Sequence, residues 1–144
     1  MRAWLLDTGP LVAYLDASDK SHQAAANCLD RFTGQLFTTS AVITEAMHFL
    51  AAAPRGAALL AEFVGQSELQ VVDFSGAEEL AEAARRMEKY ANLPMDYADA
   101  TLVLLAERLN VFDLVTLDRR GFSAFRSSGG KHFSLVLDQT EPEN

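Results

Sequence analysis

Short apolar runs alternate along the chain with longer segments whose apolar residues recur every three to four positions. The short runs predict buried strands, because turn-forming residues bound them and they are too short for helices. We expect strands at residues 3–6, 35–38, 69–74, 114–117 and 133–137. The longer segments predict helices at residues 11–15, 22–32, 41–53, 56–64, 76–90 and 96–109. Strands that alternate with helices favour a three-layer α/β/α fold, with a central, mostly parallel sheet of four to five strands.

The length of 144 residues fits a single domain that spans residues 1–144, with an acidic tail at 138–144 that we expect to fray. Apolar residues make up 49% of the chain and charged residues 22%, a globular balance. Cys28 is the only cysteine, which excludes an internal disulfide and a cysteine-rich zinc site. We find no secretory signal and no apolar run that could cross a membrane, so we expect a soluble cytoplasmic protein.

The net charge of −8 argues against sequence-independent binding of nucleic acid through bulk charge. Residues 119–131 depart from this balance. They hold four basic residues and no acid: Arg119, Arg120, Arg126 and Lys131. The segment could be a mobile basic loop that contacts substrate phosphates or a protein partner. The alternative is a solvated surface loop whose charges serve solubility.

Two carboxylates directly follow predicted strands. Asp7 comes after the run Trp4-Leu5-Leu6, and Asp118 comes after residues 114–117. In a parallel sheet both lie at the carboxyl edge, where open α/β folds bind their ligands. Taken alone, Asp7 could instead form an Asx turn before the following Gly-Pro step, and Asp118 could begin a turn.

Three further acids lie in predicted helices. Glu45 is in an otherwise apolar and small-residue helix, one turn after Ser40. Asp96 and Asp99 are three positions apart, so they share one face at the start of a helix. Each has an ordinary alternative: Glu45 as a solvated helix residue, Asp96 as an N-cap, and Asp99 as an acid favoured by the helix dipole.

Together, the two strand-end acids and the helix acids Glu45 and Asp99 point to a metal site. If they converge, each pair about 4 Å apart repels by roughly 4 kcal/mol, so the cluster must take up protons or hold a cation. Oxygen ligands without a Cys or His cluster suit Mg²⁺ or Mn²⁺, and such an ion can activate a water and stabilise charge on a phosphoryl group. Thr8 and Thr116 could orient a ligand or a water, or could be ordinary turn and strand threonines.

Other families share parts of this pattern. The string Leu-Leu-Asp-Thr-Gly at residues 5–9 resembles an aspartic-protease loop, but that family requires an all-β body and a second such loop. A phosphoryl-transfer fold of the dehalogenase type usually has a second Asp where this chain has Gly9. A receiver-type signalling domain has a lysine at the end of a late strand, and no lysine lies near Asp118. All three are poor fits.

The acidic segments resemble those of PIN-domain nucleases, specifically the VapC-type toxins of bacterial and archaeal toxin–antitoxin pairs. The resemblance follows the chain in order through LLDTGPLVAYLD, TTSAVITEAMHFL, MDYADATLVLLAERL and LVTLDRRGF. It implies a PIN-like α/β/α fold and an endoribonuclease that hydrolyses RNA with Mg²⁺ or Mn²⁺. It also implies frequent homodimers, and inhibition by a small antitoxin whose tail enters the site.

Matched to the family position by position, Asp7 is the first family acid and Glu45 the helix acid of the second segment. Asp99 and Asp118 match the third and fourth acids. The match implies that these four are the catalytic residues and metal ligands, with Asp96 as a less constant additional ligand.

The chain departs from the family at Gly121, where many relatives carry another acid. Because the four main acids remain, we expect activity to survive, with weaker occupancy of a second metal position. The alternative function is a catalytically inactive PIN scaffold that binds RNA or protein as a regulatory module.

Overall fold

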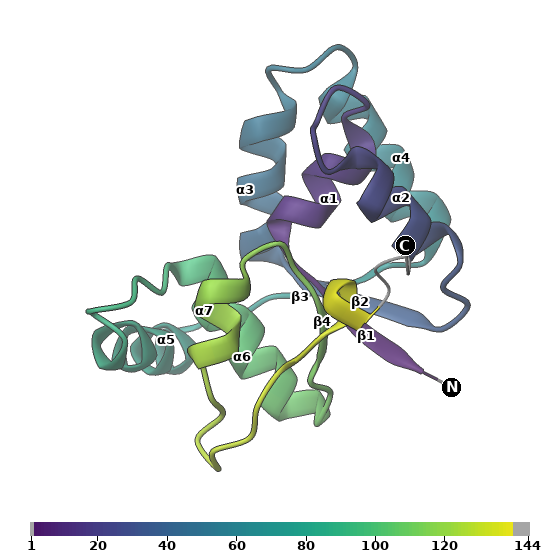
Figure 1. Cartoon of the computed structure of the whole chain (residues 1–144). Helices are drawn as coiled ribbons and strands as arrows, with labels where there is room; N and C mark the ends of the chain where they lie inside the picture. Colours follow the sequence, from purple (N-terminus) through teal and green to yellow (C-terminus); the bar gives the residue numbers. More distant parts are fainter. Residues whose placement is uncertain (1, 140–144) are drawn as a thin grey trace.

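The computed structural model describes residues 2–139. Within these residues a five-stranded sheet forms the centre, and every pair of neighbouring strands is parallel (Figure 1). The strands are β1 (Ala3–Leu6), β2 (Gln35–Thr39), β3 (Gln70–Val72), β4 (Asp113–Val115) and β5 (Ser134–Leu135). Their order across the sheet is β3-β2-β1-β4-β5. The expected parallel sheet is confirmed.

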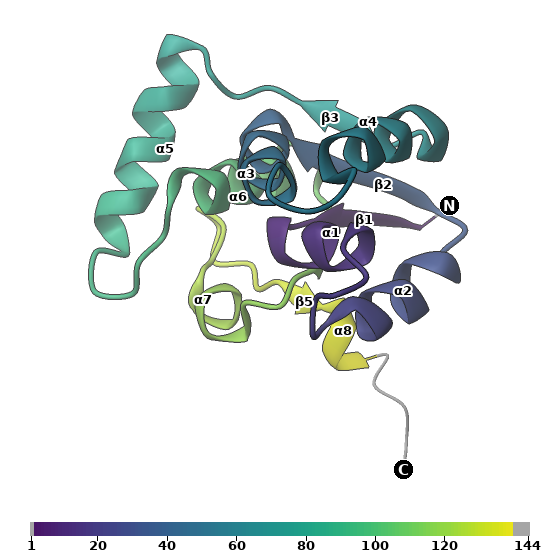
Figure 2. The ribbon, with the colours of Figure 1, turned by 90° about the horizontal axis from the view of Figure 1, so that it is seen from above.

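Helices cover both faces of the sheet. In chain order they are α1 (Thr8–Leu15), α2 (His22–Asp30), α3 (Ser40–Leu50), α4 (Gly56–Ser67), α5 (Ala77–Lys89), α6 (Tyr97–Leu109), α7 (Arg119–Ala124) and α8 (Val136–Gln139). Figure 1 shows α1 to α4 gathered on one side of the sheet and α6, with α5 beside it, on the other; Figure 2 gives the view from above. The three-layer α/β/α architecture is confirmed.

Strand β1 lies at the centre of the sheet. Leu5 pairs with Phe37 of β2 and with Leu114 of β4, and its side chain is fully buried. A strand covered on both faces must be apolar throughout, which is why Trp4, Leu5 and Leu6 form a continuous run. The backbone N–H of Asp7 donates to the Val115 carbonyl (3.0 Å), so the pairing with β4 continues to the first acid.

Helix α1 begins at Thr8, three residues earlier than expected. Asp7 is its N-cap, and its side chain accepts the Thr8 N–H. Pro10 lies in the first turn, where a backbone N–H has no helical partner, so the proline does not interrupt the helix. The Asp-Thr-Gly-Pro segment is therefore a direct strand-to-helix junction rather than a separate turn.

The chain after β4 differs most from expectation. Helix α7 occupies part of the basic segment at 119–131, for which a mobile loop and a solvated surface loop were the two alternatives. The expected strand at 133–137 is limited to Ser134–Leu135, after which α8 begins. Asp138, at the start of the expected frayed tail, lies in α8 and forms an ion pair with Arg119 (2.7 Å). Residues 140–144 of that tail lie outside the described residues.

The longest helices of the described chain have 13 residues, and none within residues 2–139 has the length and apolar character needed to cross a bilayer.

Candidate metal centre

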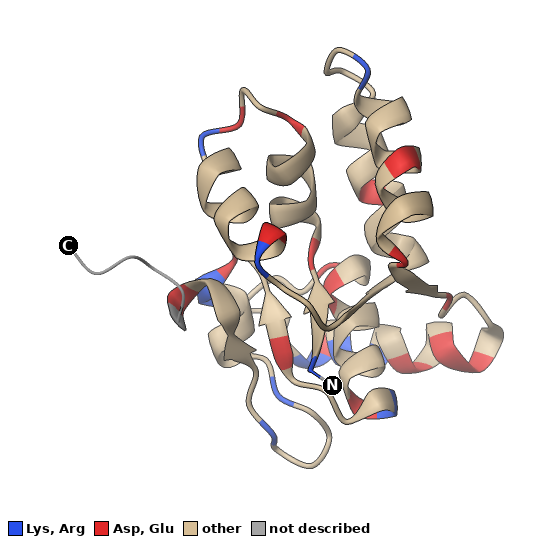
Figure 3. Ribbon diagram, turned by 90° about the vertical axis from the view of Figure 1, so that its right-hand side faces the viewer, with Lys and Arg blue, Asp and Glu red and all other residues tan. Residues whose placement is uncertain are grey.

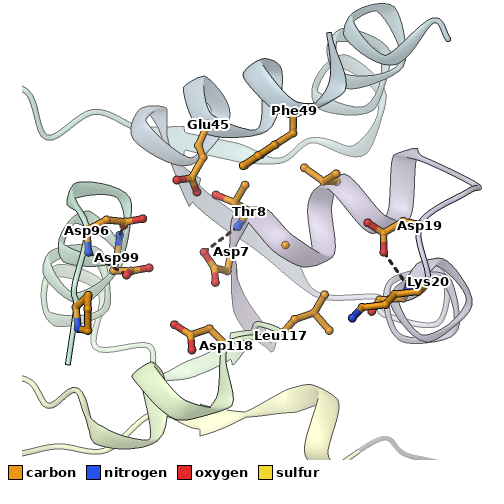
Figure 4. A pocket seen from close by; sticks show the side chains of 14 residues that line it. Asp7, Thr8, Asp19, Lys20, Glu45, Phe49, Asp96, Asp99, Leu117 and Asp118 are labelled. Atoms are coloured by element: carbon orange, nitrogen blue, oxygen red, sulfur yellow. Dashed lines mark hydrogen bonds between the residues drawn. The ribbon is translucent and has the colours of Figure 1, made fainter. Parts of the chain in front are cut away.

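Four separate elements bring acids to one cleft of about 680 Å³. Asp7 stands at the junction of β1 and α1, Glu45 in the middle of α3, and Asp99 in the first turn of α6. Asp118 follows β4 and is the N-cap of α7. Figure 4 shows these carboxylates facing the same space, with Asp96 beside Asp99. The structure thus brings together all five acids that the sequence singled out.

Asp7 is the most buried of these acids, with 7% of its surface exposed. One carboxylate oxygen accepts the Thr8 backbone N–H (2.8 Å), and the other accepts the Thr116 hydroxyl (2.7 Å). The pKa of Asp7 is raised to about 6: burial is the main cause, the hydrogen bonds from Thr116 and Thr8 oppose it, and the charges of Glu45 and Asp96 add to it. Without a bound cation, ionisation of the Asp7 carboxyl group is therefore energetically unfavourable.

Asp96 and Asp99 form a reciprocal capping box at the start of α6. The Asp99 N–H donates to the Asp96 carboxylate (2.8 Å), and the Asp96 N–H donates to the Asp99 carboxylate (3.1 Å). Asp96 is thus an N-cap, the ordinary alternative to a ligand role, and it also lines the cleft. Burial, followed by the charges of Asp96, Asp7 and Asp118, raises the pKa of Asp99 to about 8.

Thr116 connects the two strand-end acids. Its hydroxyl donates to Asp7 and accepts the backbone N–H of Asp118 (3.0 Å), so one buried side chain fixes both carboxylate-bearing junctions. Thr8 behaves differently: its hydroxyl is buried and finds no hydrogen-bond partner among the described residues, although the residue lines the cleft. An unpartnered buried hydroxyl next to Asp7 is an available oxygen ligand or water contact.

Gly121 lies against the Asp118 carboxylate. Its N–H donates to one Asp118 oxygen (2.9 Å), and a Cβ at this position would collide with the other oxygen and press on Phe125. The glycine at the position where many relatives carry an acid therefore leaves room for Asp118 to fold back over the first turn of α7.

The residues around this cleft fit a hard divalent cation that keeps part of its water shell. Within residues 2–139, no group of three or more Asp, Glu, His or Cys side chains could hold a metal ion in the positions that they have in the structure. Mg²⁺ usually takes only one or two carboxylates directly and contacts other groups through water, so this spacing suits it. The oxygen-only donor set, the two raised pKa values and the free Thr8 hydroxyl all favour such an ion.

The three arginines predicted to contact substrate or antitoxin lie outside the cleft lining. Arg119 pairs with Asp138, and Arg126 donates to the carbonyls of Ser123 and Phe125 (2.7 and 3.0 Å). Arg120 is exposed on α7. The loop between α7 and β5 carries Lys and Arg and no acid (Figure 3). Their contact with a substrate or a partner stays a prediction.

Sequence reasoning missed Lys20, which lines the cleft together with its neighbours Asp19 and Ser21. No spacing rule identifies this residue, because the loop between α1 and α2 must first fold back over α1 to bring it there.

Comparison with known proteins identifies the fold family. A family model described as the PIN domain matches residues 4–127, a range that includes all five acids. The chain belongs to the PIN-domain family. The predicted family is therefore confirmed, and the parallel α/β sheet excludes the all-β body of an aspartic protease.

Individual relatives show which PIN-domain proteins this chain resembles. It is 36% identical over 137 residues to Ribonuclease VapC26 of Mycobacterium tuberculosis, a match that covers 92% of this chain and 98% of that protein. The crystal structure of VapC20 of M. tuberculosis, a toxin that cleaves the sarcin–ricin loop, superposes with a TM-score of 0.73 at 18% identity, covering 81% of this chain and 91% of that chain. The structure of VapBC2 of Rickettsia felis, bound to a DNA fragment from its promoter, superposes with a TM-score of 0.64 at 17% identity. The match covers 92% of this chain and 98% of that chain. The resemblance to VapC-type proteins is confirmed.

Proposed function

We propose that this PIN domain is a Mg²⁺- or Mn²⁺-dependent endoribonuclease, the toxin of a toxin–antitoxin pair. The observation that carries the proposal is the convergence of Asp7, Glu45, Asp99 and Asp118 on one cleft, with the pKa values of Asp7 and Asp99 raised. The relative at 36% identity is a ribonuclease, which supports RNA as the substrate.

In this proposal Asp7, Glu45, Asp99 and Asp118 would hold the ion, one or two of them directly and the others through its water shell, and Asp96 would assist through water. When bound, the ion supplies a nucleophilic water at neutral pH and neutralises charge on the phosphodiester. Thr116 keeps the Asp7 and Asp118 carboxylates in place, and the Thr8 N–H fixes the second Asp7 oxygen. Because ligand carboxyls must lose their protons, the ion binds in competition with protons at Asp7 and Asp99.

An antitoxin partner, a homodimer and a cytoplasmic location belong to the same proposal. The structures similar to this fold include the VapBC2 assembly of Rickettsia felis, which supports a partner protein. Light scattering of the purified chain tests the dimer.

The test is cleavage of a mixed single-stranded RNA pool by the purified chain in Mg²⁺, in Mn²⁺ and in EDTA. We expect cleavage that requires the metal and that disappears in Asp7→Asn. Asp73→Asn is the matched control, since Asp73 is an exposed acid that hydrogen-bonds Ser40 and Ser75 and lies outside the cleft lining. Metal binding without cleavage would point to a narrow substrate absent from the pool, whereas the absence of both metal binding and cleavage would support the alternative, a catalytically inactive binding module.

A further inference from the structure

Lys20 lies at the end of the cleft away from the acids of α6. Among residues 2–139 it is the one Lys or Arg that lines this cleft. Figure 4 shows Lys20 across the cleft from Asp96 and Asp99, with Asp7 between them. The cleft therefore has an acidic end, where the proposed ion binds, and an opposite end where Lys20 supplies an ammonium group beside the carboxylate of Asp19.

The loop that carries Lys20 is tied down by its neighbours. Asp19 accepts the Ser21 N–H (2.8 Å), and the Asp19 carbonyl accepts the His22 N–H (3.0 Å). A ring N–H of His22 donates to the Ala13 carbonyl of α1 (2.8 Å). Lys20 itself is exposed, and no carboxylate of the described residues forms an ion pair with it. A fixed loop thus presents an unpaired ammonium group, which lowers the ordering cost of binding an anion.

Two exposed apolar side chains stand between the two ends of the cleft. Phe49 of α3 is 55% exposed and Leu117, next to Asp118, is 42% exposed, and both line the cleft. Figure 4 shows them on opposite walls, between Asp7 and Lys20. Phe49 follows Glu45 by four positions on α3, so both project from one helix face. Large apolar groups exposed inside a polar cleft suit a flat aromatic ligand, such as a nucleobase.

We propose that Lys20 binds a phosphate of the RNA strand next to the one that is cleaved, and that the intervening base lies between Phe49 and Leu117. This inference rests on the proposed function. A lysine is a compact charge suited to a phosphate oxygen, and the net charge of −8 repels RNA elsewhere, so a local cation is needed to hold the strand. A single strand supplies in one molecule the phosphate, the base and the second phosphate that the cleft is built to accept.

The test compares steady-state cleavage of one short single-stranded RNA by the wild-type chain, Lys20→Gln and Lys20→Arg. We expect Lys20→Gln to raise KM about tenfold with kcat changed less than about twofold, the effect of removing one charge-assisted hydrogen bond. Lys20→Arg should recover most of this loss. The dependence of log affinity on log salt should become shallower by about 0.7, because Lys20→Gln no longer neutralises one phosphate of a single strand.

Two further variants test whether the change in KM depends on where the lysine lies and whether the base stacks on Phe49. Lys89→Gln is the matched control, because Lys89 lies on α5 outside the cleft lining, against the Tyr90 ring; it should leave KM unchanged. Phe49→Ala should raise KM about tenfold without changing the salt dependence, because stacking carries no charge.

Binding of the same RNA, labelled with fluorescein and followed by anisotropy in Ca²⁺, separates failure of this inference from failure of the proposed function. Wild-type cleavage with an unchanged KM in Lys20→Gln would overturn the role of Lys20 and leave the nuclease intact. Binding that Lys20→Gln weakens, without cleavage by the wild type, would support the subsite and overturn the hydrolysis. Neither binding nor cleavage would overturn both.

Discussion

The replacement of Asp7 by Asn should stabilise the metal-free protein at neutral pH while removing its activity. Asp7 is buried, and its pKa is raised from 3.8 to about 6. A raised pKa means that the folded protein binds the proton more tightly than the unfolded chain. The contribution of Asp7 to stability is therefore fully present below pH about 4, falls as the pH rises towards about 6, and stays at its lower level above that.

The size of the effect follows from this shift and from the hydrogen bonds of the carboxylate. The difference between 3.8 and about 6 corresponds to about 3 kcal/mol of destabilisation at neutral pH. An Asn at this position can still accept the Thr8 N–H through its oxygen, but it places an NH2 donor where the second Asp7 oxygen accepted the Thr116 hydroxyl; loss of that hydrogen bond costs about 1 kcal/mol. The net gain expected for Asp7→Asn is therefore about 2 kcal/mol, or an increase in Tm of roughly 6 °C for a chain of this size.

The assay is urea unfolding in EDTA at a pH of about 7.5 and again at about 4.5, where the gain should disappear. Asp73→Asn is the control of opposite sign, because hydrogen bonds from Ser75 and Ser40 lower the pKa of that exposed carboxyl; it should give no gain at neutral pH. Adding Mg²⁺ should stabilise the wild type and not Asp7→Asn. An Asp7→Asn protein less stable than wild type at neutral pH without metal would refute the reasoning.

Three other perturbations test the parts that surround Asp7. Thr116→Val removes the partner of both Asp7 and the Asp118 N–H, so we expect a loss of about 1–3 kcal/mol in urea unfolding, largely restored by Thr116→Ser. Gly121→Ala places a methyl group against the Asp118 carboxylate, so cleavage should fall by up to about 10²-fold in kcat; unchanged kcat would mean that this carboxylate need not keep its position. Mg²⁺ affinity, measured by calorimetry, should rise with pH through about 6 and about 8 as Asp7 and Asp99 lose their protons, and a flat profile would contradict their role as ligands.

The order of strands and helices could be predicted because local pattern and buried position agree. The apolar run at residues 3–6 is the central strand, and the segment that becomes α6 is long, apolar along its middle and largely buried. The candidate acids could be predicted for a related reason: a carboxylate directly after a buried strand, as at Asp7, has few structural explanations besides a cap or a ligand. The structure shows that the two roles coincide, since Asp7, Asp96 and Asp118 cap helices and also line the cleft.

The features that sequence reasoning missed depend on contacts between distant segments. The early start of α1 depends on the Asp7 N–H continuing the pairing with β4, more than 100 residues away. Helix α7 forms from a short, glycine-containing, basic segment because Asp118 caps it and Phe122 is fully buried. Lys20 reaches the cleft only through the folded loop after α1. None of these contacts leaves a periodic signal in the local sequence.

Titration with Mn²⁺, in which bound ion is followed by electron paramagnetic resonance and RNA cleavage is measured in the same samples, tests the central claim most directly. The claim is that the acids of this cleft hold the ion on which cleavage depends. We predict that occupancy and cleavage rise together in the wild type and in Asp73→Asn, and that both are lost in Asp7→Asn and Asp99→Asn. Cleavage that persists without bound Mn²⁺, or Mn²⁺ binding that is unchanged in Asp7→Asn, would contradict it.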